Sequence, residues 1–372
     1  MPRIIISTSN DISTDNRVHK VATLLLDLGY DVLWIGRVLP ESLPLERPYA
    51  TKRFNLWFSK GALFYANLNI KLFFFLLFEP CDVLLSNDLD TLLANRCVSR
   101  LRGKKLVYDT HEYFLGVPEI QNRPLVKWVW RLIEKSIFPK LRYVFTVNES
   151  IATLYEKDYG KRPMVFRNIS MPPEIASWKS REELGLPVDK FIFINQGSGI
   201  NVDRGMEEVL EAVANIDGVL LLLVGKGDVI PTLKRRAKSQ KLTEKVKFID
   251  AVPYAELLQY THAANCGLSL DKDTNINYKY SLPNKLFDYI FCDIPVLSSR
   301  VVEVAGIVKR YNLGLVVHDH KPVTLTADMQ RMKVAPKAHF EPGLRKAREE
   351  LNWEKEKQVL IDFYNRLKLE LQ

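Results

Sequence analysis

The sequence has few cysteines, and none of them stand close together. Four cysteines are scattered over 372 residues without a CxxC pair. This excludes a disulfide framework and a cysteine-based zinc site, and it favours free thiols in a reducing cytoplasm. The opening stretch, MPRIIISTSND, has one basic residue and a short apolar run, so we expect a first β-strand there and not a secretory signal.

Long apolar runs and the usual dinucleotide motif are also missing. The nearest approach to the roughly 18 apolar residues of a membrane-spanning helix is Ile70 to Phe78, which opens into Glu79-Pro80. We therefore expect no membrane span. No GxGxxG follows the first predicted strand, which argues against a nicotinamide dinucleotide domain.

Negative charge is the scarcer sign. The chain has 44 acidic and 53 basic residues, which gives a net charge of +9. Residues 1–167 hold 24 of the basic and 17 of the acidic residues and carry +7, while the remainder carries +2. A basic half favours an anionic partner: a membrane surface, a phosphate-bearing substrate or nucleic acid.

What the sequence does have is a regular alternation of short apolar runs with amphipathic segments of helical length. We interpret as buried strands the runs at residues 3–7, 31–36, 82–86, 105–109, 143–147, 191–196, 219–224, 246–249, 266–270, 295–298 and 315–317. This alternation predicts the α/β class, with parallel sheets that carry helices on both faces.

One stretch interrupts the alternation. Residues 167–189 are rich in proline, serine and charge and have no strand signal, which is typical of an interdomain linker. The chain is also too long for one hydrophobic core. We predict two doubly wound, Rossmann-like domains, residues 1–167 and 168–338, followed by a helical segment, residues 339–372.

The loops at the carboxyl ends of the strands hold the candidate site residues, because open parallel sheets bind ligands there. The first such loop enters a helix at Asp15 and Arg17, where free N–H groups attract anions; a helix cap at Asp15 or Asn16 explains the same residues. Asp88 and Asp90 follow the third strand. They either cap the next helix or bind acceptor hydroxyls.

A histidine follows the next strand. His111 comes directly after strand 105–109, has a carboxylate on each side along the chain, and is followed by Glu112. A lone histidine is more often structural, but its position at the carboxyl edge favours a functional role.

Two glycine loops follow neighbouring strands of the second predicted domain. One contains Gly197, Ser198, Gly199 and Arg204, and the other runs from Gly225 through Gly227 to residue 228. Small residues let the backbone approach a phosphate, and Arg204 adds positive charge. Ordinary tight turns are the alternative.

The segment NYKYSLPNKLFDYIFCDIPVLSS, residues 277–299, is the richest in candidate residues. Lys285 and Asp288 are three residues apart and so share one face near a helix start. The lysine suits a diphosphate and the carboxylate suits a ribose; a surface ion pair is the alternative. The other candidate donor contacts in this segment are Tyr280, Ser281, Leu282 and Asn284.

PNKLFDYIFCDIPVLSS resembles the donor-site signature of family 4 glycosyltransferases, P-x-K-x-x-E-Y-x-x-x-G-x-P-V. DNRVHKVATLLLDLGYDV is similar to that family's first helix, YDTHEYF to its histidine loop and LNWEKEKQVLIDFY to its closing helix. The resemblance implies the GT-B fold, in which an acceptor domain and a donor domain face a cleft and the last helix packs back on the first domain. It also implies retaining, metal-independent sugar transfer.

The resemblance gives roles to single residues. Arg204 and Lys285 would bind the donor diphosphate, Asp288 the ribose and His111 the transferred sugar, while Val252 would flank the base. Two positions depart from the family pattern: Tyr280 stands in place of an acid eight residues before Asp288, and Ser198 stands in place of an arginine.

No cofactor is expected besides the nucleotide-sugar co-substrate, UDP- or GDP-linked, and no metal. The acceptor would be a glycan or a lipid-linked glycan in surface polysaccharide or lipopolysaccharide synthesis. The segments 52–60 and 127–131 mix cations with aromatics, which suits an anionic membrane at the inner face of the plasma membrane, although buried aromatics are the alternative.

Three other functions compete with this prediction. A non-catalytic nucleotide-sugar or glycan-binding protein would explain the departures at Tyr280 and Ser198. A GT-B nucleotide-sugar epimerase or a phosphorylase would share the fold. Nucleic-acid binding is the weakest of the three, because the excess charge is modest and the aromatic-basic segments resemble no RNA-binding module.

Overall fold

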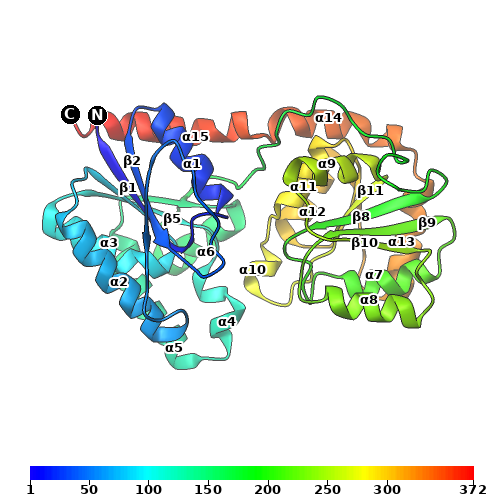
Figure 1. The fold of residues 1–372 in the computed structure, drawn as a ribbon, viewed down its shortest axis with the longest axis horizontal. Helices are drawn as coiled ribbons and strands as arrows, with labels where there is room; N and C mark the ends of the chain where they lie inside the picture. Colours follow the sequence, from blue (N-terminus) through cyan, green and yellow to red (C-terminus); the bar gives the residue numbers. More distant parts are fainter. The chain divides into compact units, whose positions relative to one another are not determined.

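The computed structural model describes residues 1–372, with the side chains of Pro118 and Glu119 excepted (Figure 1). The chain divides into two compact units. Unit 1 comprises Met1–Asn168 and Glu356–Gln372, and unit 2 comprises Ile169–Lys355. Each unit is built on one parallel sheet, which confirms the α/β class and the two doubly wound sheets.

Unit 1 has a seven-stranded sheet in the order β3-β2-β1-β4-β5-β6-β7. Its inner strands are apolar runs buried on both faces, as a parallel sheet under helices requires; Ile4, Ile5 and Ile6 have no exposed surface. The bounds are β1 (Arg3–Asp11), β2 (Asp31–Arg37), β3 (Ala50–Phe54), β4 (Val83–Asn87), β5 (Lys105–Thr110), β6 (Tyr143–Thr146) and β7 (Met164–Val165). The strand order reverses between β1 and β4, which is where such sheets bind ligands.

The helices of unit 1 connect these strands. They are α1 (Asn16–Asp27), α2 (Gly61–Phe78), α3 (Leu89–Arg102), η1 (Phe114–Gly116), α4 (Pro118–Gln121), α5 (Pro124–Ile137), η2 (Phe138–Lys140) and α6 (Glu149–Tyr159). The chain returns to unit 1 in α15 (Trp353–Leu369). There the hydroxyl of Tyr30 donates to the carbonyl of Tyr364 (2.7 Å), and the rings of Phe145 and Phe363 meet at 4.9 Å.

Unit 2 has a six-stranded sheet in the order β10-β9-β8-β11-β12-β13, with its reversal between β8 and β11. The strands are β8 (Phe191–Gly197), β9 (Val219–Gly225), β10 (Val246–Ile249), β11 (Cys266–Ser269), β12 (Val296–Ser298) and β13 (Gly314–Val316). The helices are α7 (Met206–Ala214), α8 (Ile230–Ser239), α9 (Tyr254–Ala263), α10 (Ile276–Lys279), α11 (Asn284–Phe291), α12 (Val302–Tyr311), α13 (Pro322–Val334), η3 (Lys337–His339) and α14 (Glu341–Glu350).

Helix α2 corrects the expectation that no segment is long enough to cross a membrane. Its 18 residues have a mean hydropathy of 1.6, and by length and composition alone it passes as a membrane span. The expectation counted only the run Ile70 to Phe78, because Asn67 and Asn69 interrupt the apolar pattern before it, whereas the helix includes both parts. Only 28% of this helix is buried inside the fold.

Two strands, β3 and β7, were not expected. Strand β3 lies at the edge of the sheet beside β2, and Lys52 and Arg53 break its apolar pattern. Edge strands of this kind carry charge and therefore lack the apolar run by which a buried strand is identified.

Candidate functional site

At the carboxyl edge of the unit 1 sheet, His111 lies between two aspartates. Its Nδ1 is 3.4 Å from an oxygen of Asp88, and its Nε2 is 3.3 Å from an oxygen of Asp109 and 3.1 Å from the amide oxygen of Asn87. Burial disfavours a charge on the ring, but the two carboxylates outweigh it and raise the pKa of His111 to about 9. The imidazole is therefore protonated at neutral pH, and both ring nitrogens are donors.

Asp88 positions His111 both by its charge and by a hydrogen bond to the backbone of His111, and its own backbone conformation is unusual. It has φ of 58° and ψ of 167°, which is unusual for a residue other than glycine. It occupies the N-cap position of α3 without a side-chain capping bond, and its carboxylate instead accepts the backbone N–H of His111 at 2.9 Å. The alternative that Asp88 caps the helix is therefore excluded, and strain of this type is commonest at functional sites.

Asp15 and Arg17, both predicted to bind the acceptor, have structural partners. Asp15 caps α1 by accepting the backbone N–H of Val18 at 3.0 Å, which confirms the capping alternative for this residue. Arg17 is buried, and its guanidinium binds both oxygens of Asp109 at 3.0 and 3.1 Å and lies over the ring of Phe166. The structure thus directs Arg17 into the unit and not toward the open edge of the sheet.

The Arg17 pair also affects the electrostatics at His111. Burial favours the neutral form of Asp109, but the positive charges of Arg17 and His111 outweigh this and hold the pKa of Asp109 well below its usual range. Asp109 therefore stays ionised, accepts from both cations and fixes one side of the imidazolium.

The other two acidic candidates of unit 1 differ in exposure. Asp90 is buried in the first turn of α3 and accepts the hydroxyl of Ser9; burial, with the charge of Asp88, raises the pKa of Asp90 to about 7. Glu112 has an exposed side chain, and its carbonyl accepts the hydroxyl of Thr110 at 2.7 Å.

At the carboxyl edge of the unit 2 sheet, two cations lie near one buried carboxylate. Arg204 pairs with Asp271 at 2.5 Å and stacks over the ring of Tyr278 at 4.1 Å. Lys285, in the first turn of α11, has no side-chain hydrogen bond or ion pair within the described part of the chain. Burial lowers the pKa of its ammonium, with the charges of Asp271 and Asp288 opposing that and the charge of Arg204 adding to it.

Asp288, the predicted ribose ligand, is 5% exposed and already bound within the unit. One carboxylate oxygen accepts from the amide of Gln196 at 2.9 Å, and the other from the hydroxyl of Tyr254 at 2.7 Å. A carboxylate oxygen has two lone pairs and can accept more than one hydrogen bond. Gln196 is in turn held by the hydroxyl of Thr261.

The two predicted glycine loops pack against one another. A Cβ at Gly225 would come within 2.0 Å of the carbonyl oxygen of Gly197, and one at Gly227 within 1.9 Å of that of Ile200. The backbone N–H of Ile200 donates to Lys226, and the N–H of Lys226 donates to Gly197, both at 3.1 Å. The tight-turn alternative thus accounts for Gly225 and Gly227, whereas Gly199 has open space around it.

The remaining predicted donor residues surround the start of α11. Ser281 has a buried hydroxyl without a partner in the described structure, and Ser198 and Asn284 are exposed. Leu282 and Val252 pack against the unit 2 core. Tyr280 is half-buried, and the ammonium of Lys279 lies 5.5 Å from its ring.

Sequence reasoning did not name several residues of these two clusters as site residues. Asp109 and Gln196 are the next-to-last residues of β5 and β8, and Asp271 comes two residues after the end of β11. These are the same kind of position that identified Asp88, so the same signal would have found them. Tyr254 begins α9 and carries no such signal.

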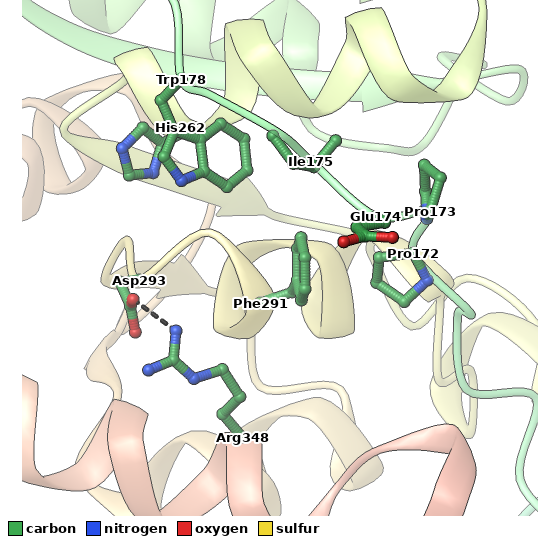
Figure 2. A pocket seen from close by; sticks show the side chains of 9 residues that line it. All are labelled: Pro172, Pro173, Glu174, Ile175, Trp178, His262, Phe291, Asp293 and Arg348. Atoms are coloured by element: carbon green, nitrogen blue, oxygen red, sulfur yellow. Dashed lines mark hydrogen bonds and ion pairs between the residues drawn. The ribbon is translucent and has the colours of Figure 1, made fainter.

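A cavity of unit 2 lies away from these residues. It has a volume of about 540 Å³ and lies where the chain enters the unit, near the C-terminal end of α11 (Figure 2). Trp178 stacks on His262 at 4.1 Å in its wall, and Arg348 pairs with Asp293 at 2.6 Å. None of the predicted donor residues lines it. Among the described side chains, no group of three His, Cys, Asp or Glu has a geometry that could hold a metal.

Two family models match adjoining parts of the chain. Residues 15–168 match the model described as Glycosyltransferase Family 4, and residues 176–339 match Glycosyl transferases group 1. A chitobiosyldiphosphodolichol beta-mannosyltransferase of Candida albicans is 23% identical over 248 residues, which cover 60% of this chain and 53% of that protein. The chain therefore spans about half the length of this curated relative.

Solved structures are similar over nearly the whole chain. A sucrose-phosphate synthase from Thermosynechococcus elongatus has a TM-score of 0.77 at 18% identity, with all of both chains covered. HepE of Anabaena in complex with UDP has a TM-score of 0.73 at 14% identity over 98% of this chain and 100% of that one. WaaG, a glycosyltransferase involved in lipopolysaccharide biosynthesis, has 0.67 at 14% identity over 94% and 95%. At such identities the likeness shows the fold alone.

Proposed function

Because the chain belongs to the group 1 glycosyltransferases, with the GT-B fold of its structural neighbours, we propose that it moves a sugar from a nucleoside diphosphate onto a glycan or lipid-linked acceptor. The UDP bound in HepE supports a UDP-linked donor. The diphosphodolichol in the name of the Candida albicans relative supports a lipid-linked acceptor, and WaaG supports a role in surface polysaccharide or lipopolysaccharide synthesis.

The arrangement of Arg204 and Lys285 carries the donor-site proposal. Negative charge builds on the diphosphate as its bond to the sugar breaks, and cations fixed in advance near that position stabilise it. Asp271 fixes Arg204 at 2.5 Å, so its orientation does not depend on the donor. The ammonium of Lys285 has no competing ion pair in the described chain.

His111 is the proposed contact to the transferred sugar. The pKa of about 9 keeps it an imidazolium at neutral pH, so it does not act as a general base. It would donate to a sugar hydroxyl by sharing one of the two N–H groups that face Asp88 and Asp109. Asp88 and Asp109 are positioning residues, since they hold the ring and its charge.

We further propose that transfer retains the anomeric configuration. The acceptor oxygen bonds to the sugar C1 on the face from which the diphosphate departs, the C1–O bond to phosphate breaks, and the departing phosphate oxygen takes the acceptor proton. The paired and buried state of Asp271 and Asp288 makes each a poor covalent nucleophile, which supports this route.

Metal independence is part of the same proposal. Arg204, Lys285 and the N-terminus of α11 would supply the positive charge that a divalent cation provides in other sugar transferases. The four cysteines are free thiols, three of them buried, which supports a reducing cytoplasmic compartment.

Thermal unfolding with UDP, GDP, dTDP, ADP and CMP, each with and without EDTA, tests the donor site. A nucleotide at about 100 times its dissociation constant should stabilise the fold by roughly 2.7 kcal/mol. We expect a shift with one diphosphate that is unchanged by EDTA and lost in Lys285→Ala. Lys279→Ala, an exposed lysine on the neighbouring α10, is the matched control and should keep the shift.

The outcomes separate the competing functions. A shift that vanishes with EDTA overturns metal independence, and the absence of any shift overturns the intact donor site. A shift without transfer to any acceptor favours a non-catalytic binding protein, for which the exposed Ser198 in place of a cation is the supporting observation. The anomeric proton coupling of the product, measured by NMR, distinguishes retention from inversion.

A further inference from the structure

The outer face of unit 1 combines exposed apolar side chains with cations. Helices α2, α3 and α5 are neighbours on one side of the unit, and the rings of Tyr65 and Trp130 join α2 to α5 at 5.0 Å (Figure 1). Of the 23 large apolar side chains that are exposed in the described structure, 12 lie on these helices or in the loop before α2. They are Trp57, Phe58, Leu63, Ile70, Phe74, Phe78, Leu93, Leu101, Leu125, Trp128, Val129 and Leu132.

These side chains form stripes at helical spacing. On α5 the exposed residues 125, 128, 129 and 132 follow the i, i+3, i+4, i+7 pattern of one helix face. On α2 the exposed residues 63, 70, 74 and 78 likewise share one face, while Phe64, Leu68 and Leu72 are buried on the other. An apolar face of this kind is typical of an interaction surface and not of a solvated one.

The charge of the same face has one sign. Helices α2, α3 and α5 together contain seven lysines and arginines and two acidic residues, and both acids, Asp90 and Glu134, are buried. No acidic side chain on these three helices is therefore exposed. Helix α14 of unit 2, by contrast, carries both signs on its exposed surface.

We propose that this face, which we call the α2–α5 face, rests on an anionic lipid bilayer, with its apolar stripes in the headgroup region and its cations against lipid phosphates. A symmetric contact with a second copy would bring like charges together. A nucleic acid would leave the apolar stripes without a partner. An anionic bilayer matches both properties.

Helix α2 lies on the bilayer and does not cross it. Asn67 accepts the backbone N–H of Trp57 at 2.9 Å, and Asn69 binds the carbonyl of Asp90 at 2.8 Å and the N–H of Ala94 at 3.1 Å. These bonds hold one side of the helix to unit 1, and a spanning helix would lose them.

The proposal rests on the proposed function and narrows its acceptor to a lipid-linked one. Helix α5 follows the loop that carries His111, and Phe114 of that loop packs on Trp130 of α5 at 5.1 Å. A face on the bilayer beside this loop brings His111 near acceptors that are anchored in the same membrane.

Co-sedimentation of the full chain with vesicles tests the proposal. We expect binding to phosphatidylcholine vesicles that contain phosphatidylglycerol, little binding to phosphatidylcholine alone, and release at high salt. In Arg131→Gln/Lys135→Gln, each removed cation should lower the partition coefficient about fivefold. Phe74→Ser/Trp128→Ser should lower it by at least as much.

The matched control is Val323→Ser/Lys346→Gln, an exposed apolar residue and an exposed cation of unit 2, which should bind like the unaltered protein. Equal binding to both kinds of vesicle, no binding, or equal loss in the control would overturn the proposal. A dimer of the unaltered protein that dissociates in Phe74→Ser/Trp128→Ser would also overturn the proposal. Vesicle binding needs no donor, so the two proposals can fail separately. If the protein does not bind vesicles but UDP or another nucleotide still shifts its thermal unfolding, the proposed function stands. If it binds vesicles but no nucleotide shifts its unfolding, only the proposed function is overturned.

Discussion

Replacing Asp88 by asparagine removes one of the two carboxylates that keep His111 protonated. An asparagine oxygen can still accept the backbone N–H of His111, and the backbone conformation of φ 58° and ψ 167° is as unfavourable for asparagine as for aspartate, so the change adds no new backbone strain. The change therefore removes charge and preserves shape. We expect the pKa of His111 to fall from about 9 toward its ordinary 6.5, with Asp109 holding it above that value.

The free energy at stake follows from the same pKa. A rise from 6.5 to about 9 corresponds to about 3 kcal/mol of stabilisation, shared between the two carboxylates. Because the folded pKa is the higher one, this contribution is complete below pH 6.5 and is lost as the pH rises through about 9. Burial raises the pKa of Asp88 itself, so the pair is charged only between the pKa of Asp88 and that of His111. The Asp88→Asn protein should therefore be less stable by on the order of 1–2 kcal/mol near pH 6.5, and this difference should shrink as the pH rises through about 9.

NMR titration of the histidine ring signals measures the pKa directly, and a His111→Gln protein assigns the signal. Urea unfolding of the Asp88→Asn and unaltered proteins, on both sides of the titration, measures the free energy. A His111 that titrates near 6.5 in the unaltered protein would refute the reasoning. A stability difference that does not change with pH would refute it as well.

Three other substitutions test buried parts of the two units. Gly225→Ala should destabilise unit 2 by about 1–3 kcal/mol or more, because its Cβ would overlap a backbone carbonyl, while Gly199→Ala has open space and should unfold thermally like the unaltered protein. Asp288→Asn should raise the KM for the donor about tenfold through the ribose contact, and a fall in kcat alone would contradict that role. At pH values above 7, Glu134→Gln should raise the thermal midpoint of unfolding, because burial raises the pKa of Glu134 to about 7 and the charged carboxylate destabilises the fold. This gain should vanish below pH 4.5, and a gain that does not change with pH would contradict the reasoning.

The fold class could be predicted from the sequence because each buried parallel strand is a short, continuous run of apolar residues. Residues 4–6 and 219–224 are continuously apolar, and they form inner strands of the two sheets. Strand β3 lacked that signal because its charged residues lie at a sheet edge. The apolar length of α2 was underestimated because polar residues on its inner side interrupt the run.

The sequence predicted which residues lie at the candidate site but not which side chains they contact. His111 and Asp88 follow strands, and that local fact singled them out. The burial of Arg17 against Asp109 joins residues 92 apart in sequence, and the bonds of Asp288 to Gln196 and Tyr254 also depend on tertiary packing. No periodicity or spacing carries this information, so the roles of these residues stay predictions that only substitution can test.

The return of the chain to unit 1 in α15 has a consequence for biosynthesis. Unit 2 is an insertion within unit 1, because residues on both sides of it, Met1–Asn168 and Glu356–Gln372, build the same compact body. At ribosomal rates of about 5–20 residues per second, the strands of unit 1 leave the ribosome roughly 10 to 40 s before α15 does. During that interval Tyr30 and Phe145 lack the side of the core that Tyr364 and Phe363 later cover. The nascent first unit is therefore a natural chaperone client, and a chain truncated before residue 356 should release unit 2 folded and unit 1 unfinished.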